Sequence, residues 1–198
     1  MNVLKPEYNM AIFAVFTYFF ASIPFGLVFS KLAGIGDIRN IGSGNIGATN
    51  VLRTGNKKVA ALTLIFDVLK GALPVFISSY FIPGQEFSIG FLAILSHIFP
   101  VYLKFKGGKG VATTIGVFMA WNQVFGLLVL VSWLLTAKIF KISSLSALIA
   151  AMLAPFYAYF LGMPNHGIVF VVFIALVLLY THRENIKRIL KNEESVIS

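Results

Sequence analysis

Long apolar runs dominate this chain, and short polar or glycine-rich stretches separate them. Several runs reach the ~20 residues that an α-helix needs to cross a hydrocarbon core of ~30 Å. Because backbone polar groups inside a bilayer must be hydrogen-bonded within the segment, such runs predict membrane-spanning helices. The predicted apolar segments are 10–30, 58–82, 87–103, 111–137, 144–161 and 166–181.

The fourth segment is longer than one span requires, and Trp121-Asn122-Gln123 interrupts it with a polar pair beside an aromatic residue of the interfacial type. Read as one span, it places Lys138 and Lys141 on the face opposite the lysines of the preceding loop. Split into a short segment 111–120 and a segment 124–137, it brings all the loop charges into agreement. The pattern therefore predicts an all-α polytopic membrane protein with about seven transmembrane helices, one of them short.

Positive charge then defines the orientation. In the split arrangement the turns near 83–86, 121–123 and 162–166 contain no Lys or Arg, whereas the loops of the other side are basic. The positive-inside rule makes the basic side cytoplasmic, with the N-terminus outside and the C-terminus in the cytoplasm. The basic set is Lys31, Arg39, Arg53, Lys57, Lys58, Lys104, Lys106, Lys109, Lys138, Lys141, Arg183, Lys187, Arg188 and Lys191.

Composition agrees with this class. The chain is 58% hydrophobic and 12% charged, whereas soluble domains carry about 25% charged residues. No polar stretch is long enough for a second domain, so residues 1–198 are predicted to form a single integral-membrane domain. The absence of cysteine excludes disulfides and a Cys nucleophile. The net charge of +9 is scattered over short membrane loops, which argues against a nucleic-acid partner.

Two loops combine glycine with positive charge: residues 42–53, which begin Gly-Ser-Gly-Asn-Ile-Gly and end at Arg53, and residues 104–114, which contain Gly-Gly-Lys-Gly. Glycine lets backbone N–H groups converge on an anion, and Lys or Arg neutralises it. The first loop follows a membrane span rather than a strand, and the second lacks the P-loop spacer, so neither predicts a nucleotide site. The pair instead predicts handling of phosphorylated molecules at the membrane surface.

Three further polar features lie in or beside the spans. Asp67 and Lys70 lie three residues apart on one helix face, which predicts an intramembrane ion pair. His97 is expected to make a structural hydrogen bond. On a continuing helix His182 and Asn185 point the same way. A histidine at a membrane edge is more often interfacial than catalytic, but the nearby basic loops favour a functional role for His182. The seven carboxylates form no cluster with His, so no metal site and no cofactor are predicted.

Together these motifs resemble the PlsY family, the bacterial membrane acyl-phosphate:glycerol-3-phosphate acyltransferases. The resemblance implies a multi-pass protein of the bacterial plasma (inner) membrane with its active site facing the cytoplasm. It also implies transfer of a fatty acyl group to the 1-hydroxyl of glycerol 3-phosphate, the first acylation of phospholipid synthesis. The stretches that carry it are Ser22–Gly26, Asp37–Asn40, Gly42–Arg53, Phe105–Thr113 and His182–Ile186.

The resemblance also implies the site residues. The catalytic set is Ser43, Arg53, Lys109, His182 and Asn185. The set expected to bind substrate phosphate is Gly42, Gly44, Asn45, Thr49, Asn50, Gly107, Gly108, Gly110, Thr113 and Ser144. The family uses a serine in the loop before the sixth span, where this chain offers Ser143, Ser144 and Ser146; Ser144 is favoured.

The expected chemistry is direct attack by the substrate hydroxyl on acyl phosphate, without an acyl-enzyme. The expected products are lysophosphatidic acid and phosphate, and either His182 or a substrate phosphate oxygen serves as the base. The expected partners are acyl phosphate, glycerol 3-phosphate and membrane lipids, with the protein acting as a monomer. The alternative is a transporter of a phosphorylated metabolite, which would place polar groups near the midplane, often in inverted repeats. No repeat is evident, and the distinctive residues gather at one face.

Overall fold

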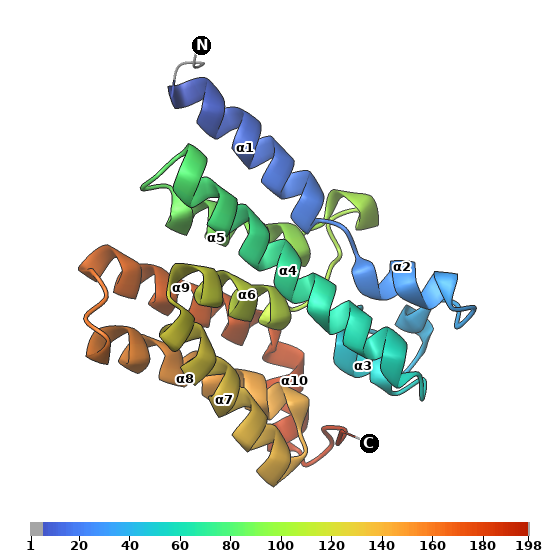
Figure 1. The fold of residues 1–198 in the computed structure, drawn as a ribbon. Helices are drawn as coiled ribbons and strands as arrows, with labels where there is room; N and C mark the ends of the chain where they lie inside the picture. Colours follow the sequence, from blue (N-terminus) through green and yellow to red (C-terminus); the bar gives the residue numbers. More distant parts are fainter. Residues whose placement is uncertain (1–5, 198) are drawn as a thin grey trace. The chain divides into compact units, whose positions relative to one another are not determined.

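A computed structural model describes residues 6–197. Within these residues every regular element is helical, and the chain divides into two compact units, Met1–Trp121 and Asn122–Ser198 (Figure 1). The all-α class predicted from the apolar runs is therefore confirmed. That residues 1–198 act as one integral-membrane domain stays a prediction.

The first unit is organised around its longest helix, α4. Its other α-helices all pack against α4, and Figure 1 shows α2 and α3 beside the half of α4 that begins at Lys57. The elements of this unit are α1 (Pro6–Ala21), α2 (Phe25–Leu32), η1 (Ile38–Asn40), α3 (Ala48–Leu52), α4 (Lys57–Phe81), α5 (Glu86–Ile98), η2 (Val101–Leu103) and α6 (Val111–Trp121).

Helices α4 and α6 approach each other closely because each offers a glycine at the contact. A Cβ atom on Gly71 would overlap the carbonyl oxygen of Thr113, and one on Gly116 would overlap the carbonyl oxygen of Val68. Small residues at such contacts let helix backbones come together in membrane proteins, where the lipid provides no hydrophobic drive for helix association. The start of α6, where the second basic loop ends, is thereby held against the middle of α4.

The segment predicted as one span over 10–30 is broken, which corrects the sequence-based expectation. Helices α1 and α2 meet at a bend of 43° around Ser22–Pro24. Pro24 has no backbone N–H to continue the helical ladder, and this loss is a common cause of sharp helix bends. The break exposes the carbonyl of Ile23, which accepts a hydrogen bond of 2.8 Å from the Lys70 Nζ.

The second unit places α8 between α7 and α9. Alanine lines the buried side of α8, and Ser132 of α7 hydrogen-bonds Tyr157 of α8 at 2.7 Å. The expectation that one helix continues through His182 and Asn185 is wrong, because α9 and α10 meet at His182 with a bend of 62°. The elements are α7 (Gln123–Phe140), α8 (Ser143–Phe160), α9 (Asn165–Thr181) and α10 (Arg183–Leu190).

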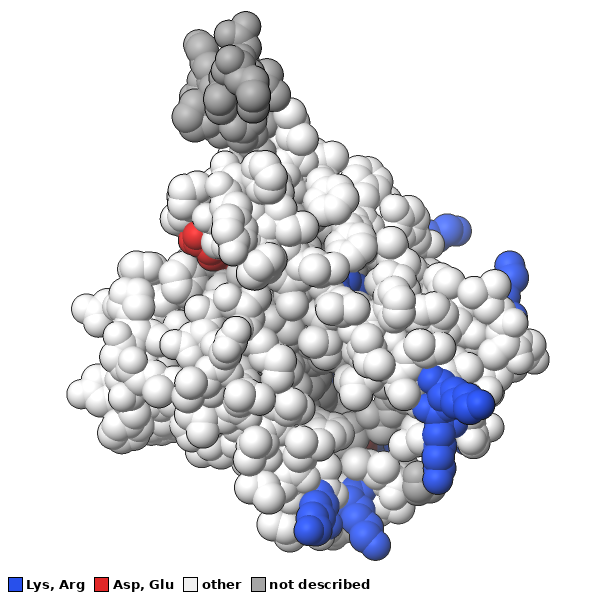
Figure 2. Space-filling view, in the orientation of Figure 1, with Lys and Arg blue, Asp and Glu red and all other residues white. Residues whose placement is uncertain are grey.

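Four of the described helical segments are long and apolar enough to cross a membrane, or up to six if each bent pair counts as one span. The predicted split of 111–137 is confirmed: the Asn122 side chain accepts a hydrogen bond from the N–H of Phe125 and caps the start of α7. The face drawn in Figure 2 is mostly uncharged, and most of the charged side chains visible on it are Lys or Arg. A total of seven spans and the orientation of the termini stay predictions.

Candidate functional site

The first glycine-rich loop is built around a buried asparagine. Asn50 of α3 is 2% exposed, and its Nδ2 donates to the carbonyl of Ile38 at 2.8 Å. Its Oδ1 accepts from the backbone N–H of Ser43 at 3.0 Å, from the Ser43 hydroxyl at 3.3 Å and from Arg53 at 3.5 Å. The structure thus brings Ser43 and Arg53 together through Asn50. Asn50 itself is an internal organiser of the loop.

Glycine is required at the turn beside Asn50. Gly42 has a φ of 54°, and a Cβ atom there would lie 2.6 Å from the Asn50 Oδ1 and 2.8 Å from the Arg53 Cδ. A side chain would be strained in this backbone conformation and would also displace the asparagine from its hydrogen bonds. Gly42 therefore lets the chain fold tightly over Asn50, so that Ser43 remains exposed at the surface of the loop.

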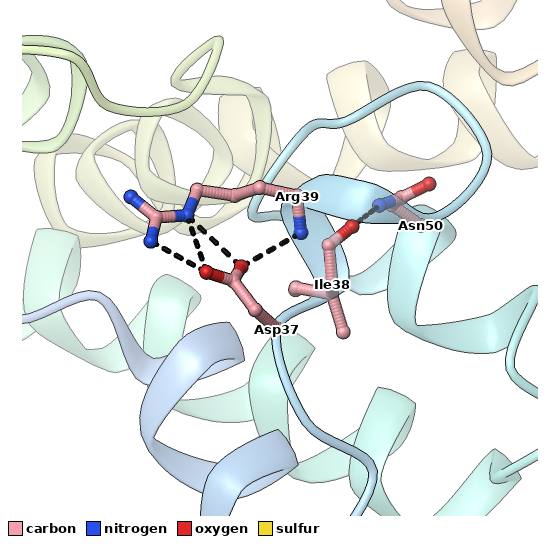
Figure 3. Close-up of polar contacts among 4 residues, drawn as sticks. All are labelled: Asp37, Ile38, Arg39 and Asn50. Atoms are coloured by element: carbon pink, nitrogen blue, oxygen red, sulfur yellow. Dashed lines mark hydrogen bonds and ion pairs between the residues drawn. The ribbon is translucent and has the colours of Figure 1, made fainter.

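An ion pair lies just before this loop in the chain. Arg39 donates through its backbone N–H and its Nε to the Asp37 carboxylate at 3.0 Å and 2.9 Å, and Figure 3 shows its guanidinium folded back over Asp37. These side-chain and backbone hydrogen bonds lower the pKa of Asp37 to about 2. The pair is exposed, so it shapes the loop entry and is expected to contribute little to global stability.

The second basic loop is fastened to the end of α5. The N–H groups of Gly107 and Gly108 donate to the carbonyls of Ile98 and His97 at 3.0 Å and 3.1 Å. Those of Ser43 and Gly44 in the first loop are similarly occupied, by the Asn50 side chain and the Ile41 carbonyl. These four amides therefore stabilise the conformation of the loops. Fewer loop amides than expected are left to converge on an anion.

Positive charge in the second loop comes from side chains. Lys109 is half-buried and lies two residues before Val111, where α6 begins. The start of a helix carries a partial positive charge that favours an anion, so Lys109 and the first turn of α6 act in the same direction. Gly110 lies between them with a φ of 88°. Thr113 is fully buried beside Gly71, so its side chain lies within the helix contact.

A buried polar group lies directly behind this loop. Lys70 and Asp67 form the predicted ion pair at 2.7 Å, with side chains 1% and 3% exposed. The Nδ1 of His97 lies 3.8 Å from the Asp67 Oδ1, which is too far for a hydrogen bond. A Cβ atom on Gly108 would overlap the Nε2 of His97. The ring of His97 therefore supports the loop by packing, beside the ion pair.

The third motif lies in the second unit, at the bend between α9 and α10. The Nδ1 of His182 is 2.8 Å from the carbonyl oxygen of Leu178. Because a carbonyl can only accept, the neutral imidazole carries its proton on Nδ1, and its Nε2 keeps a lone pair. His182 is buried.

Asn185 and Ser144 share a partner that sequence reasoning missed. The Asn185 Nδ2 donates to the Glu194 Oε1 at 2.6 Å, and the Ser144 hydroxyl donates to the same oxygen at 2.8 Å. The Ser146 hydroxyl instead donates to the carbonyl of Ile142, the residue just before α8. In the sequence, Glu194 follows another glutamate in a polar tail and carries no motif signal.

The charge of Glu194 is well supported. Partial burial raises the pKa of its carboxyl group, but hydrogen bonds from Asn185, Ser144 and Arg188 outweigh that effect, and the net shift is downward. The Arg188 Nε donates to the second carboxylate oxygen at 2.6 Å. Glu194 is therefore ionised at neutral pH, and it acts as an acceptor for all three donors.

The predicted residues thus form two groups. The first unit holds Ser43, Asn50 and Arg53 in one cluster and places Lys109 at the start of α6; the second unit holds His182 and brings Ser144 and Asn185 to Glu194. The other predicted loop residues, Asn45 and Thr49, are half-buried within the first loop. Across residues 6–197 no group of three His, Asp or Glu side chains is arranged to hold a metal ion.

Apolar helices, two basic glycine-containing loops and a buried His–Asn motif define a helical integral membrane protein with positively charged loops. The chain belongs to the glycerol-3-phosphate acyltransferase family, whose model matches residues 11–192. It is similar to the glycerol-3-phosphate acyltransferase of Brucella anthropi, with 49% identity over 92% of this chain and 90% of that protein. The protein of that name from Mesorhizobium japonicum is 48% identical over 96% of this chain and 97% of its own.

Solved structures agree with the family. The chain is similar to the crystal structure of PlsY (YgiH), an integral membrane glycerol 3-phosphate acyltransferase, in its glycerol 3-phosphate form, with a TM-score of 0.89 and 36% identity over 95% of both chains. For the lysophosphatidic acid form of PlsY the TM-score is 0.86, with 35% identity over 94% of both chains. The resemblance to the PlsY family inferred from the motifs is confirmed.

Proposed function

We propose that this protein transfers a fatty acyl group from acyl phosphate to the 1-hydroxyl of glycerol 3-phosphate, giving lysophosphatidic acid and inorganic phosphate. Family membership supports the acceptor and the product, because the similar PlsY structures are glycerol 3-phosphate and lysophosphatidic acid forms. The proposal rests mainly on the presence of two separate cationic loops. In one loop Arg53 is hydrogen-bonded to Asn50, and in the other Lys109 lies just before the start of α6. Two substrates that each carry a phosphate need such a pair.

The proposed reaction is a direct transfer. The C1 oxygen of glycerol 3-phosphate forms a bond to the acyl carbonyl carbon, and the bond between that carbon and the phosphate oxygen breaks. The hydroxyl proton passes to the Nε2 of His182 or to a phosphate oxygen of a substrate, and inorganic phosphate leaves. Acyl phosphate is already an activated anhydride, so the protein needs no nucleophile of its own.

Positioning and charge stabilisation are the protein's contribution in this proposal. Arg53 suits bidentate contact with a phosphate, and Lys109 with the first turn of α6 suits a second one. Holding both reactants in the attack geometry is worth about 7–11 kcal/mol of the barrier, and general base catalysis adds about 10²–10⁴-fold. In this proposal the reaction takes place at the cytoplasmic face of the bacterial inner membrane, in a monomer and without a cofactor, as the first acylation of phospholipid synthesis.

The test is a turnover assay of the purified protein with glycerol 3-phosphate and either palmitoyl phosphate or palmitoyl-CoA. We expect lysophosphatidic acid from the acyl phosphate alone. Incubation with palmitoyl phosphate in the absence of glycerol 3-phosphate should leave the intact protein mass unchanged, because no acyl-enzyme forms. Product from the CoA ester alone, or a stable gain in mass equal to a palmitoyl group, would contradict the donor or the direct transfer respectively.

Asn50→Ala is expected to lower kcat/KM by about 10–100-fold, because Ser43 and Arg53 lose their common hydrogen-bond acceptor. Small displacements of the groups that position a substrate reduce the reaction rate strongly. The substitution also removes one of the two hydrogen bonds to the buried Ile38 carbonyl, which keeps the Ile41 N–H, at a cost of about 0.5–1.5 kcal/mol of stability. Thr54→Ala is the matched control, since it removes a side-chain hydrogen bond to the Val51 carbonyl next to the same short helix. Equal activity of the two variants, measured on folded protein, would show that Asn50 does not organise the site.

A further inference from the structure

The C-terminal segment after α10 turns back and attaches to the turn between α7 and α8. Asn192 adopts a left-handed conformation with a φ of 57°, and the N–H of Glu193 donates to the Arg188 carbonyl at 2.8 Å. The N–H of Ile197 donates to the carbonyl of Lys141 at 2.6 Å. Glu194 lies between these two attachments. It also lies just beyond residues 11–192, which the family model matches.

The Glu194 side chain is only 6% exposed, although its neighbour Glu193 is exposed. One carboxylate oxygen accepts from both Asn185 and Ser144, and the other accepts from the Arg188 Nε. Three donors from two helices thus meet one acceptor. Hydrogen bonds to an ionised group are shorter and stronger than neutral ones, and the contacts of 2.6 and 2.8 Å fit this description.

These contacts restrict what Asn185 and Ser144 present on their other sides. A carboxylate accepts only, so the Asn185 amide must turn an N–H toward Glu194, which fixes the direction of its Oδ1. The Ser144 hydroxyl gives its single proton to Glu194, so only its lone pairs remain for another partner. Both side chains are therefore held in one orientation by a residue that the reaction itself does not need.

We propose that Glu194 is a positioning residue of the acyltransferase site: it orients Asn185 and Ser144 and secures the start of α10 at the bend that carries His182. This inference rests on the proposed function for the roles of Asn185 and Ser144. The opposite role would be that of a plug: Glu194 would then occupy hydrogen-bond donors that a substrate phosphate needs for its own binding. The favoured role is positioning, because the same segment is also attached through Arg188 and Ile197, and a removable plug needs no such attachment.

The experiment compares Glu194→Gln with Glu193→Gln, a neutralisation of the adjacent exposed carboxylate. The amide keeps the size of Glu194 but offers one acceptor and one donor where Asn185, Ser144 and Arg188 all donate. We expect Glu194→Gln to lower kcat by about 10–100-fold, the scale of loss for a misplaced catalytic group, with a smaller change in KM. Glu193→Gln should match the wild type. Glu194→Asp, which keeps the charge, should recover part of the rate.

A readout independent of turnover separates this inference from the donor assignment. Hydrogen–deuterium exchange over residues 182–190 should be faster in Glu194→Gln than in the wild type, and unchanged in Glu193→Gln. If the wild type makes product only from another acyl donor, the proposed donor fails and the variants are compared with that other donor. The positioning role is overturned if Glu194→Gln leaves kcat unchanged or leaves the exchange unchanged. It is also overturned if Glu194→Gln lowers KM and raises kcat, a result that would make Glu194 a plug.

Discussion

Replacing Lys109 with alanine is expected to reduce turnover by at least about 10²–10³-fold while leaving the protein folded. The loss is large because Lys109 provides a full positive charge beside the first turn of α6, where a phosphate would gain from both. The fold should survive because the second loop is held by backbone hydrogen bonds of Gly107 and Gly108 to the end of α5, and these do not involve the Lys109 side chain.

The measurement is kcat and KM for both substrates, together with the unfolding transition in detergent. Lys106→Ala is the control, because Lys106 is an exposed lysine of the same loop and its removal changes the net charge equally. Lys109→Arg should keep the charge but alter its geometry, so an intermediate rate is expected. Near-normal turnover of Lys109→Ala would remove Lys109 from the proposed phosphate site.

The second large effect is expected on stability, from Lys70→Met. This change leaves the buried Asp67 carboxylate without its cation and removes one of the two hydrogen bonds to the Ile23 carbonyl, which keeps the Phe25 N–H. Breaking a buried ion pair by removing one partner costs about 3–5 kcal/mol. Because Gly108 packs on His97 beside this pair, the second basic loop should loosen as well, and activity should fall with stability.

Equilibrium unfolding in mixed micelles measures the free energy of unfolding of this variant. Lys58→Met is the control, since Lys58 is an exposed lysine on the same helix. The double variant Asp67→Leu/Lys70→Met should regain a substantial part of the lost stability, because it removes the unpaired charge as well. A Lys70→Met protein as stable as the wild type, or a double variant less stable than the single one, would show that the pair does not stabilise the fold.

Apolar runs and composition predicted most of the helices because each is a local property. An apolar run long enough for the bilayer must hydrogen-bond its own backbone, so the helices at 57–81, 123–140 and 143–160 follow from the sequence. Local polarity was also enough to predict the break at Asn122, where a capping side chain ends the apolar run. The break around Pro24 was missed, although proline is a local signal, because the surrounding run contains no charged residue.

The contacts within the candidate site were harder to predict from the sequence. Its motifs identified Ser43, Arg53, Lys109 and His182 as candidates, and the i,i+3 spacing of Asp67 and Lys70 correctly predicted their ion pair. Spacing does not tell which group a side chain contacts, however. Asn50 was assigned to substrate phosphate, whereas three of its hydrogen bonds are to Ser43 and Arg53 of the same loop.

The sequence by itself determined that this is a helical membrane protein with two basic loops, because hydropathy and charge act along the chain, and its motifs determined the family. Only the tertiary structure decided the rest: which loop amides are already occupied, that Asn50 joins Ser43 to Arg53, and that Glu194 joins Ser144 to Asn185. The physical reason is that a hydrogen bond depends on the distance and direction between two groups. Residues 144 and 194 lie fifty positions apart, and folding alone brings such groups together.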